Sequence, residues 1–592
     1  MKFIDKLFGR KEPDPIDFTL LFTSDEHSSL IPHSPALAHV LDNAETDTKG
    51  GFARLSTKVE EVKQESDEPV FLVSSGDFLT GTPFGWLSLY GQSPSLEVMK
   101  AIGYDAVGLG NHEFDYGVDV LADCIEETDL EKTTLIGSNL SASKGSKLVE
   151  GKHFKKSHIV KKGDLSLGFV SCLGEDAVNI ILDLDEVEFN KQAKALKKIS
   201  DNLKKEGADL VVALVHGGLE EAKELAKIKN VDVIVSGHTH VSFSEPVKVK
   251  GTYIVQAGFE IEQLGKVEFS YLPDGELRIK NEDQSCLIPI DSNIEEDTKI
   301  VSLVEKYSDL LSEKVANLTN GKYQSIFDVV THCDFEVSHQ PPLAETPVGN
   351  FVTDAMRVTT QKLLNKKVDI AIQANGSIRK SITPDKKTNK ISFYDLVSAV
   401  GLRKGETKKP GDSIISFYLK GEEVRQILEI AVLVQEFIGN SAFLQFSGLR
   451  YSYNPADAVL FKIPIFEQAV PSADAVNQIE IYKGDGPQPS EGEEFESLKK
   501  NRLYHVITSF RIFRLALEIQ RLHPRLNLSP KKKDGSEIPK DNLNRLIIKR
   551  DGQEFKVWEA ILDYADSWMR KGDNLQIPDY YQTGQKRINP LK

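Results

Sequence analysis

The chain has 592 residues, which is too long for a single hydrophobic core, and the usual domain size allows roughly three to six units or two large domains with insertions. Its 89 acidic residues outnumber 73 lysines and arginines, and the formal net charge of −16 argues against a general nucleic-acid binder or a protein that binds anionic membranes. No stretch reaches the ~18 apolar residues of a membrane span.

The N-terminus is polar, and residues 1–13 lack the ~7–15-residue apolar run of a secretory signal. We therefore expect a short tail over residues 1–15. The cysteines are widely spaced and form no CxxC pair, which predicts buried thiols and not a disulfide or zinc framework. Both observations predict a cytoplasmic protein; a periplasmic or exported protein is the alternative if a leader is missing or atypical. The cysteines are Cys124, Cys172, Cys286 and Cys333.

Five predicted strands each run into a turn that carries Asp, His or Asn. Helical patterns over residues 56–65 and 188–206 fall between them. Open sheets place ligands where strand ends meet at one edge, so we expect these side chains to converge. The strands are residues 18–23, 69–73, 106–107, 209–215 and 231–235, and the polar residues that follow them are Asp25 and His27, Asp77, Asn111 and His112, His216, and His238 and His240.

This donor set favours a metal site. Carboxylate, imidazole and amide oxygen without thiolate suit divalent ions such as Mn²⁺, Zn²⁺, Fe²⁺ or Co²⁺, with Mg²⁺ as a further candidate. Seven candidate ligands exceed one tetrahedral site, and a shared carboxylate can bridge two ions ~3.5–4 Å apart. We therefore expect two divalent metal ions.

The order D-x-H, G-D, G-N-H-E-x-D, H and G-H-x-H resembles the calcineurin-like metallophosphoesterases, and the segment from Gly110 to Gly117 resembles their 5′-nucleotidase branch. The resemblance spans residues 16–275 and implies a four-layer αββα catalytic domain. His240 stands where some periplasmic nucleotidases have Gln, which could alter the metal preference. The resemblance implies that Asp25, His27 and His240 bind one ion, that Asn111, His216 and His238 bind the other, and that Asp77 bridges them.

The resemblance also separates His112 from the metal ligands. It implies that His112 lies beside the phosphate, where an imidazolium neutralises phosphoryl charge or protonates the leaving oxygen, and that Asp115 orients the ring. The nucleophile would be a metal-bound water, made hydroxide-like near neutral pH by its cations.

A second domain is predicted after a linker. Residues 276–340 combine a polar loop with an amphipathic helix over residues 294–315, and residues 341–592 form the second α/β domain. A helix is predicted from Pro347 and a strand over residues 368–372, and both resemble the C-terminal domain of 5′-nucleotidases. That resemblance implies that Asn375, Gly376 and Arg379 bind substrate, with the guanidinium pairing with phosphate. The alternative is a surface arginine in a salt bridge.

The end of the chain departs from the family pattern. Residues 508–515 predict a helix where nucleotidases have a late G-G-D-G-Y segment. Phe510 or Phe513 could supply a face for stacking a base, but core packing is the stronger alternative for each. The tail from Pro578 to Lys592 is predicted to pack late or stay mobile.

Together these features predict an α/β protein, α+β overall, that hydrolyses a phosphoester. We expect a small phosphorylated substrate, with a nucleotide favoured. Cyclic 2′,3′-phosphodiesterases, UDP-sugar hydrolases and thiosulfohydrolases share the two-domain plan and stay open as alternatives. A non-catalytic binding protein is the alternative from a different class.

Overall fold

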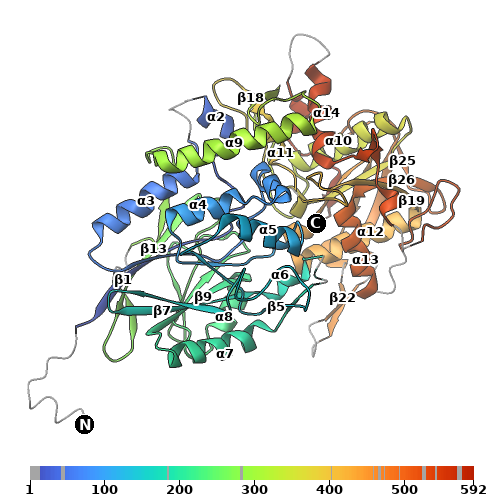
Figure 1. The fold of residues 1–592 in the computed structure, drawn as a ribbon. Coiled ribbons are helices and arrows are strands. Elements are labelled where there is room, and N and C mark those ends of the chain that lie inside the picture. The colour runs from blue at the N-terminus through green and yellow to red at the C-terminus, as the bar shows by residue number, and fades with distance from the viewer. Residues whose placement is uncertain are drawn as a thin grey trace, which may run out of the picture. The chain divides into compact units, whose positions relative to one another are not determined.

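The computed structural model describes residues 14–591 apart from 42–46, 183, 185, 281–283, 402, 458, 464–467, 472–473, 493, 523–527, 540–542 and 570–575. Most of the predicted N-terminal tail lies outside these residues. The chain divides into two compact units (Figure 1). Unit 1 comprises Met1–His33 and Ala44–Leu311, and unit 2 comprises Ser34–Asn43 and Ser312–Lys592.

Unit 1 contains a seven-stranded mixed sheet. Strand β1 (Ile16–Thr23) lies at its centre, parallel to β2 (Val70–Ser74) and antiparallel to β13 (Gln263–Tyr271). The order continues from β2 to β3 (Ala106–Gly108) and β4 (Thr134–Ile136), while β14 (Leu277–Ile279) and β15 (Leu287–Pro289) pair with β13.

A second sheet of six strands completes the interior of unit 1. Its order is β11 (Val247–Val249), β12 (Thr252–Val255), β10 (Val233–Ser236), β9 (Leu210–His216), β7 (Leu165–Leu173) and β6 (Ser157–Lys162). Every residue of β9 is buried. The strand pairs in parallel with β10 on one side and β7 on the other, and both of its faces are covered.

The two sheets face each other across a hydrophobic core. Phe71 of the first sheet lies near Phe169 of the second, with ring centroids 6.3 Å apart. On the far side of the second sheet, helices α7 (Gln192–Lys205) and α8 (Gly218–Leu225) bury Leu196, Leu203 and Leu225. Helices α3 (Phe52–Glu65), α4 (Pro94–Ile102) and α5 (Val118–Thr128) lie on the opposite side of the sandwich (Figure 1). The αββα layering expected from the resemblance is confirmed.

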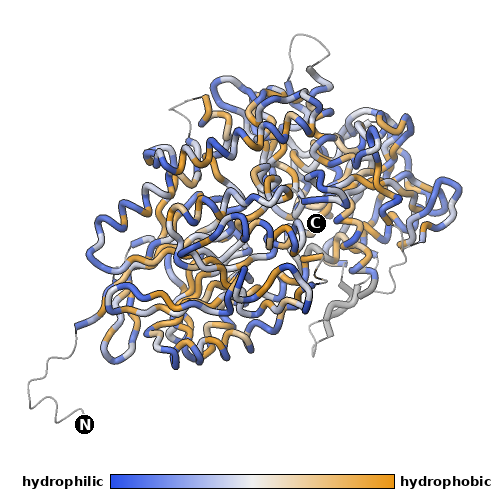
Figure 2. The backbone as a smooth tube through the Cα atoms, in the orientation of Figure 1, coloured by the Kyte–Doolittle hydropathy of each residue, from blue (hydrophilic) through white to orange (hydrophobic). Residues whose placement is uncertain are grey.

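Hydropathy follows these layers. In Figure 2 the strands of unit 1 are mostly orange, whereas α7 alternates between blue and orange along its length. This pattern is the one expected of a helix with one buried face. The helix begins at Gln192, later than predicted, because Val187–Phe189 forms strand β8 and pairs with β5 (Leu140–Ala142).

The five predicted strands are all present, but they do not share one sheet edge. Strands β1, β2 and β3 belong to the first sheet, whereas β9 and β10 belong to the second. The polar turns therefore meet at the same end of two stacked sheets.

Unit 2 is built on two four-stranded sheets. The first has the order β19 (Ile414–Lys420), β26 (Leu503–Ser509), β17 (Ile370–Ala374) and β20 (Leu444–Ser447), and the second β25 (Phe495–Ser497), β24 (Val476–Tyr482), β21 (Leu449–Tyr453) and β29 (Ile588–Pro590). The longer helices are α10 (Pro347–Leu364), α12 (Gly421–Ile438), α13 (Phe510–Leu522) and α14 (Val557–Met569).

Helix α10 begins as its sequence predicts. The hydroxyl of Thr346 accepts a hydrogen bond from the backbone N–H of Gly349 at 3.1 Å, and Pro347 occupies the first turn.

The border between the units falls inside the connecting helix α9 (Thr298–Leu318), within the predicted linker of residues 276–340. In addition, α2 (Ala36–Val40) belongs to unit 2. The backbone N–H groups of Ala36 and Leu37 donate to the buried carboxylate of Asp395 at 2.7 and 3.2 Å, which fixes α2 beside helix α11 (Phe393–Val397).

The predicted alternative of a mobile tail is wrong. Strand β29 pairs in parallel with β21, and Arg587 is fully buried with its guanidinium 2.7 Å from the carboxylate of Asp354. The tail therefore forms part of the unit 2 core. The prediction of buried thiols is confirmed, because all four cysteines are free and buried. Among the described residues, no helix combines the length and the apolar composition needed to cross a membrane.

Candidate active site

The polar turns of unit 1 converge as three groups of side chains that could hold a metal ion. Asp25, His27 and His240 form one set, and Asp77, His216 and His238 form another that shares no residue with it. The third group, His27, Asp77 and His112, overlaps both sets. Within each set, one donor atom per residue lies within 4.8 Å of the others. The first set contains the residues that the resemblance implied for one ion. For the other ion the resemblance implied Asn111, His216 and His238 with Asp77 shared, and these metal roles stay a prediction.

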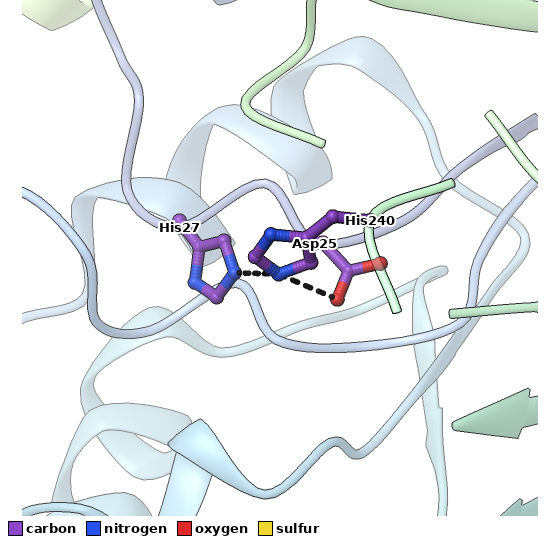
Figure 3. Close-up of side chains that lie close together, drawn as sticks. All are labelled: Asp25, His27 and His240. Carbon is purple, nitrogen blue, oxygen red and sulfur yellow. Dashed lines mark hydrogen bonds and ion pairs between the residues drawn. The ribbon is translucent and has the colours of Figure 1, made fainter. Parts of the chain in front are cut away.

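The first set is compact (Figure 3). Nε2 of His27 hydrogen-bonds with Nε2 of His240 at 3.0 Å, and the latter atom lies 3.6 Å from Oδ1 of Asp25. Nδ1 of His27 hydrogen-bonds to the carbonyl of Thr80 at 2.9 Å. Because a carbonyl only accepts, Nδ1 carries the proton, and Nε2 directs its lone pair towards His240, where a cation would replace the hydrogen bond between the two rings.

The second set is deeply buried around His216. Its Nε2 lies 3.0 Å from Oδ2 of Asp77 and 3.9 Å from Oδ1 of Asp25, and its ring lies beside that of His238 with centroids 5.2 Å apart. Nδ1 of His216 hydrogen-bonds to the carbonyl of Ser75 at 3.1 Å, so this ring also turns Nε2 towards the site.

One buried donor atom shows that the residues fit a divalent ion. Within the described part of the chain, Oδ1 of Asn111 makes no hydrogen bond. A buried polar atom without a partner is costly, and a cation would satisfy it. The set of carboxylates, imidazoles and an amide suits the borderline and hard divalent ions named above.

The backbone at these positions is unusual. Five of the seven predicted ligands have positive φ angles, a conformation that few residues other than glycine adopt. Such strain is retained at functional sites when the surrounding structure enforces it. The angles are +53° at Asp25, +49° at His27, +65° at Asp77, +81° at His238 and +57° at His240.

Glu113 braces the loop of Asp77. Its carboxylate accepts four backbone hydrogen bonds of 2.6 to 3.0 Å, from Asp77, Phe78, Leu79 and Gly110. Gly110 is required at this point, because a Cβ there would lie 2.2 Å from Oδ1 of Asp77. The two turns are thus locked together.

Burial and mutual charge set the protonation of the cluster. Burial raises the pKa of Asp25 to about 7 although His216 opposes the shift. Burial opposes ionisation of Asp77 as well, but His216 and His112 outweigh it and hold the pKa of Asp77 well below its usual value. Burial would lower the pKa of His216, but the charge of Asp77 reverses this and raises it to about 9. A bound cation would take the place of the proton on His216.

His112 is held from both ends. Its backbone N–H donates to Oδ1 of Asp77 at 2.8 Å, and its Nδ1 lies 2.6 Å from Oδ2 of Asp115. The hydroxyl of Thr80 donates to the same Asp115 oxygen at 2.8 Å. Asp115 is therefore placed where it can orient the His112 ring, the part that the resemblance implied for it.

Sequence reasoning missed Thr80 and Glu113. Thr80 contacts both His27 and Asp115. The only feature of the sequence that could have pointed to it is its position in the turn after Asp77. Glu113 stands between two predicted site residues but is neither a predicted ligand nor a predicted catalytic group.

The predicted substrate-binding residues all belong to unit 2. Arg379 is partly exposed, and its backbone N–H donates to Ala399 at 2.9 Å. The amide of Asn375 is buried, donating to Asn440 and accepting from Gln445.

Gly376 and Phe510 have packing roles. A Cβ at Gly376 would lie 2.8 Å from the carbonyl oxygen of Ser441. Phe510 is 8% exposed and belongs to the hydrophobic core of unit 2 together with Phe513, so little of its ring is open to a base. Substrate binding by these residues stays a prediction.

Two family descriptions match the chain. Residues 18–242 match the calcineurin-like phosphoesterases, and residues 328–512 match the 5′-nucleotidase C-terminal domain. The 5′-nucleotidase of Bos taurus is 26% identical over 522 residues, covering 83% of this chain and 86% of the relative.

Solved structures share the fold. A 5′-nucleotidase precursor from Thermus thermophilus superposes with a TM-score of 0.69 at 21% identity, covering 97% of this chain and 99% of that one. The sulfate thiohydrolase SoxB of the same organism reaches 0.65 at 17% identity, covering 98% of each chain. These superpositions show a likeness of fold.

Proposed function

The chain belongs to the 5′-nucleotidase family of calcineurin-like metallophosphoesterases and is a phosphohydrolase, and from this premise we propose that it uses two divalent metal ions to release phosphate from a nucleotide. The proposal concerns the number of ions and the substrate. The two three-residue donor sets of unit 1 carry it.

Each protein group has a part in the proposed reaction. One set of three side chains would hold each ion, with Asn111 added to the second set and Asp77 shared. When bound, two such ions supply a water of lowered pKa and positive charge towards the phosphoryl oxygens. His112 would donate a proton to the leaving oxygen, and Asp115 would hold its ring in the orientation for that transfer. Arg379 would pair with phosphate on the substrate.

The test compares variants of the full-length protein with AMP and added Mn²⁺. We expect His112→Ala to lower kcat by about 10²- to 10⁴-fold with unchanged metal content, because the histidine acts on the reaction and not on the ion. Asp77→Ala should lose both metal and activity. His158→Ala, on strand β6, is the matched control and should behave as wild type. Undiminished activity in either active-site variant would overturn the proposal.

Activity against a panel of substrates tests which compound the protein hydrolyses. AMP, 2′,3′-cyclic AMP, UDP-glucose and thiosulfonate substrates represent the nucleotidase, cyclic phosphodiesterase, sugar-nucleotide hydrolase and thiosulfohydrolase alternatives. We expect AMP to have the highest kcat/KM. Preference for a sulfur substrate would instead assign the chain to the chemistry named for SoxB, whose fold it shares.

A non-catalytic binding protein is the alternative from another class. The complete donor set and the His112–Asp115 pair speak against it, because neither is needed for binding alone. Elemental analysis after metal-replete purification separates the two: close to zero bound divalent ions favours the binding protein.

A further inference from the structure

Phe259 stacks on His240. The two rings are nearly parallel, with an interplanar angle of 13° and centroids 4.8 Å apart. Phe259 lies in the connection between strands β12 and β13, far from the turn of β10 that carries His240. The motifs that identify the ligands do not include it.

The backbone around Phe259 is tied to two ligand-bearing turns. The N–H of Gly258 donates to Val241, directly after His240, at 3.2 Å, and the N–H of Glu260 donates to the carbonyl of Asp25 at 2.8 Å. The hydroxyl of Ser24 donates to Gly258 at 3.0 Å. Hydrogen bonds on either side of Phe259 therefore fix where its ring lies relative to Asp25 and His240.

Glu260 adds a further anchor. It is 6% exposed, its side chain lies 3.7 Å from His33, and its φ angle is +50°. Ile261 follows with a φ of +60°. The connection is thus a tightly held turn, which suits it to present a ring in one position.

His240 is more exposed than three of the other candidate ligands. Its side chain is 31% exposed, whereas those of Asp25, Asp77 and His216 are at most 1% exposed. On His240 an aromatic ring covers one face and restricts rotation of the imidazole, while leaving the ring edge, with Nε2, directed at His27 and Asp25 (Figure 3).

We propose that Phe259 is a positioning residue for His240, which sets the plane of the imidazole and so strengthens ion binding at the site formed by Asp25, His27 and His240. The inference rests on the proposed two-ion function. Groups that orient metal ligands govern affinity without touching the ion. From the energy of an aromatic stack, loss of the ring should weaken binding at this site by about 2- to 12-fold.

The test titrates Mn²⁺ alone into chelator-treated full-length protein and measures stoichiometry and affinity by calorimetry. Wild type should bind two ions. Phe259→Leu, which keeps an apolar side chain but removes the flat ring, should lower the affinity for one ion and leave the affinity for the other unchanged. Phe259→Tyr keeps the ring and should restore wild-type affinity. Glu262→Ala, an exchange on the same turn, is the matched control and should match wild type.

A double-mutant cycle separates positioning from general damage. In a His240→Gln background, adding Phe259→Leu should cause no further loss, because Phe259 acts through the imidazole. The unfolding temperature of the ion-free protein should be the same for Phe259→Leu and wild type. The inference would be overturned if Phe259→Leu bound both ions with the affinities of wild type, or if Phe259→Leu had an undiminished effect in the His240→Gln background. Either result would spare the proposed function. Wild-type protein that binds no Mn²⁺ would overturn both.

Discussion

Nδ1 of His112 lies 2.6 Å from Oδ2 of Asp115, three residues further along the chain. The same Asp115 oxygen accepts the hydroxyl of Thr80. The ring that would meet the substrate is therefore oriented by a carboxylate that is itself held in place, the arrangement expected for a general acid.

Replacing Asp115 should slow catalysis without removing metal. For Asp115→Asn we expect kcat to fall by about 10- to 100-fold, because the ring loses the carboxylate that holds its orientation. Thr80→Val should have a smaller effect. The double variant should match Asp115→Asn alone, because the Thr80 hydroxyl acts through Asp115. Steady-state kinetics with metal analysis checks this, and additive losses would show that Thr80 acts by another route.

Glu113→Gln should destabilise unit 1. Four backbone N–H groups face the carboxylate, and an amide NH₂ would confront at least one of them with a second donor. A buried donor without its acceptor costs about 1–3 kcal/mol, and we expect the free energy of unfolding to fall by this amount. Chemical denaturation measures it. The same substitution at the exposed Glu126, Glu126→Gln, is the control and should change stability much less.

Neighbouring residues of the C-terminal segment should differ sharply in their contribution to stability. Arg587 is fully buried against Asp354, whereas Lys586 pairs with Glu491 at the surface. Arg587→Ala removes the ion-pair partner of the buried Asp354 carboxylate, to which only the hydroxyls of Ser447 and Tyr581 would then still be seen to donate, and should cost about 3–5 kcal/mol. Lys586→Ala should have a much smaller effect, because solvent screens its exposed pair with Glu491. Thermal unfolding of both variants tests this, and equal losses would contradict a role for the buried pair.

His339 should make the protein less stable in acid. Burial, with Arg379 adding to it, lowers the pKa of His339 from 6.5 to about 4. Between these values the unfolded chain binds a proton that the folded chain does not, so stability falls as the pH drops from 6.5 towards 4. The full loss is about 1–3 kcal/mol, allowing for partial exposure of the ring.

The variant His339→Gln isolates this contribution. Glutamine does not titrate, so the free energy of unfolding should fall less steeply between pH 6.5 and about pH 4 than in wild type. Well above the pKa of the unfolded histidine the two proteins should keep a constant difference. Parallel slopes across the acid range would show that His339 is not responsible.

The convergence of the candidate ligands could be predicted from the sequence because its signal is local. Each predicted ligand stands within a few residues of a strand end, and β1, β2, β3, β9 and β10 all form as predicted. The pairing of His112 with Asp115 is local too, since both lie in one turn.

Other features depend on contacts between distant parts of the chain. Phe259 is separated from His240 by strands β11 and β12, so no spacing rule joins them. The tail looked polar enough to be loose, but Arg587 finds a buried partner in Asp354, which lies far earlier in the chain. Pairings across such separations are set by tertiary packing and leave no periodic mark in the sequence.

The place of α2 has a consequence for how unit 2 can be made. Its residues leave the ribosome long before Asp395, the carboxylate that caps them, and the whole of Ala44–Leu311 is synthesised in between. Unit 2 therefore cannot complete its native contacts as a simple C-terminal fragment. A gene cut at the border within α9 would leave both Asp395 oxygens without the Ala36 and Leu37 donors. Expression of unit 2 by itself would require residues 34–43 to be supplied, either in trans as a peptide or grafted ahead of Ser312.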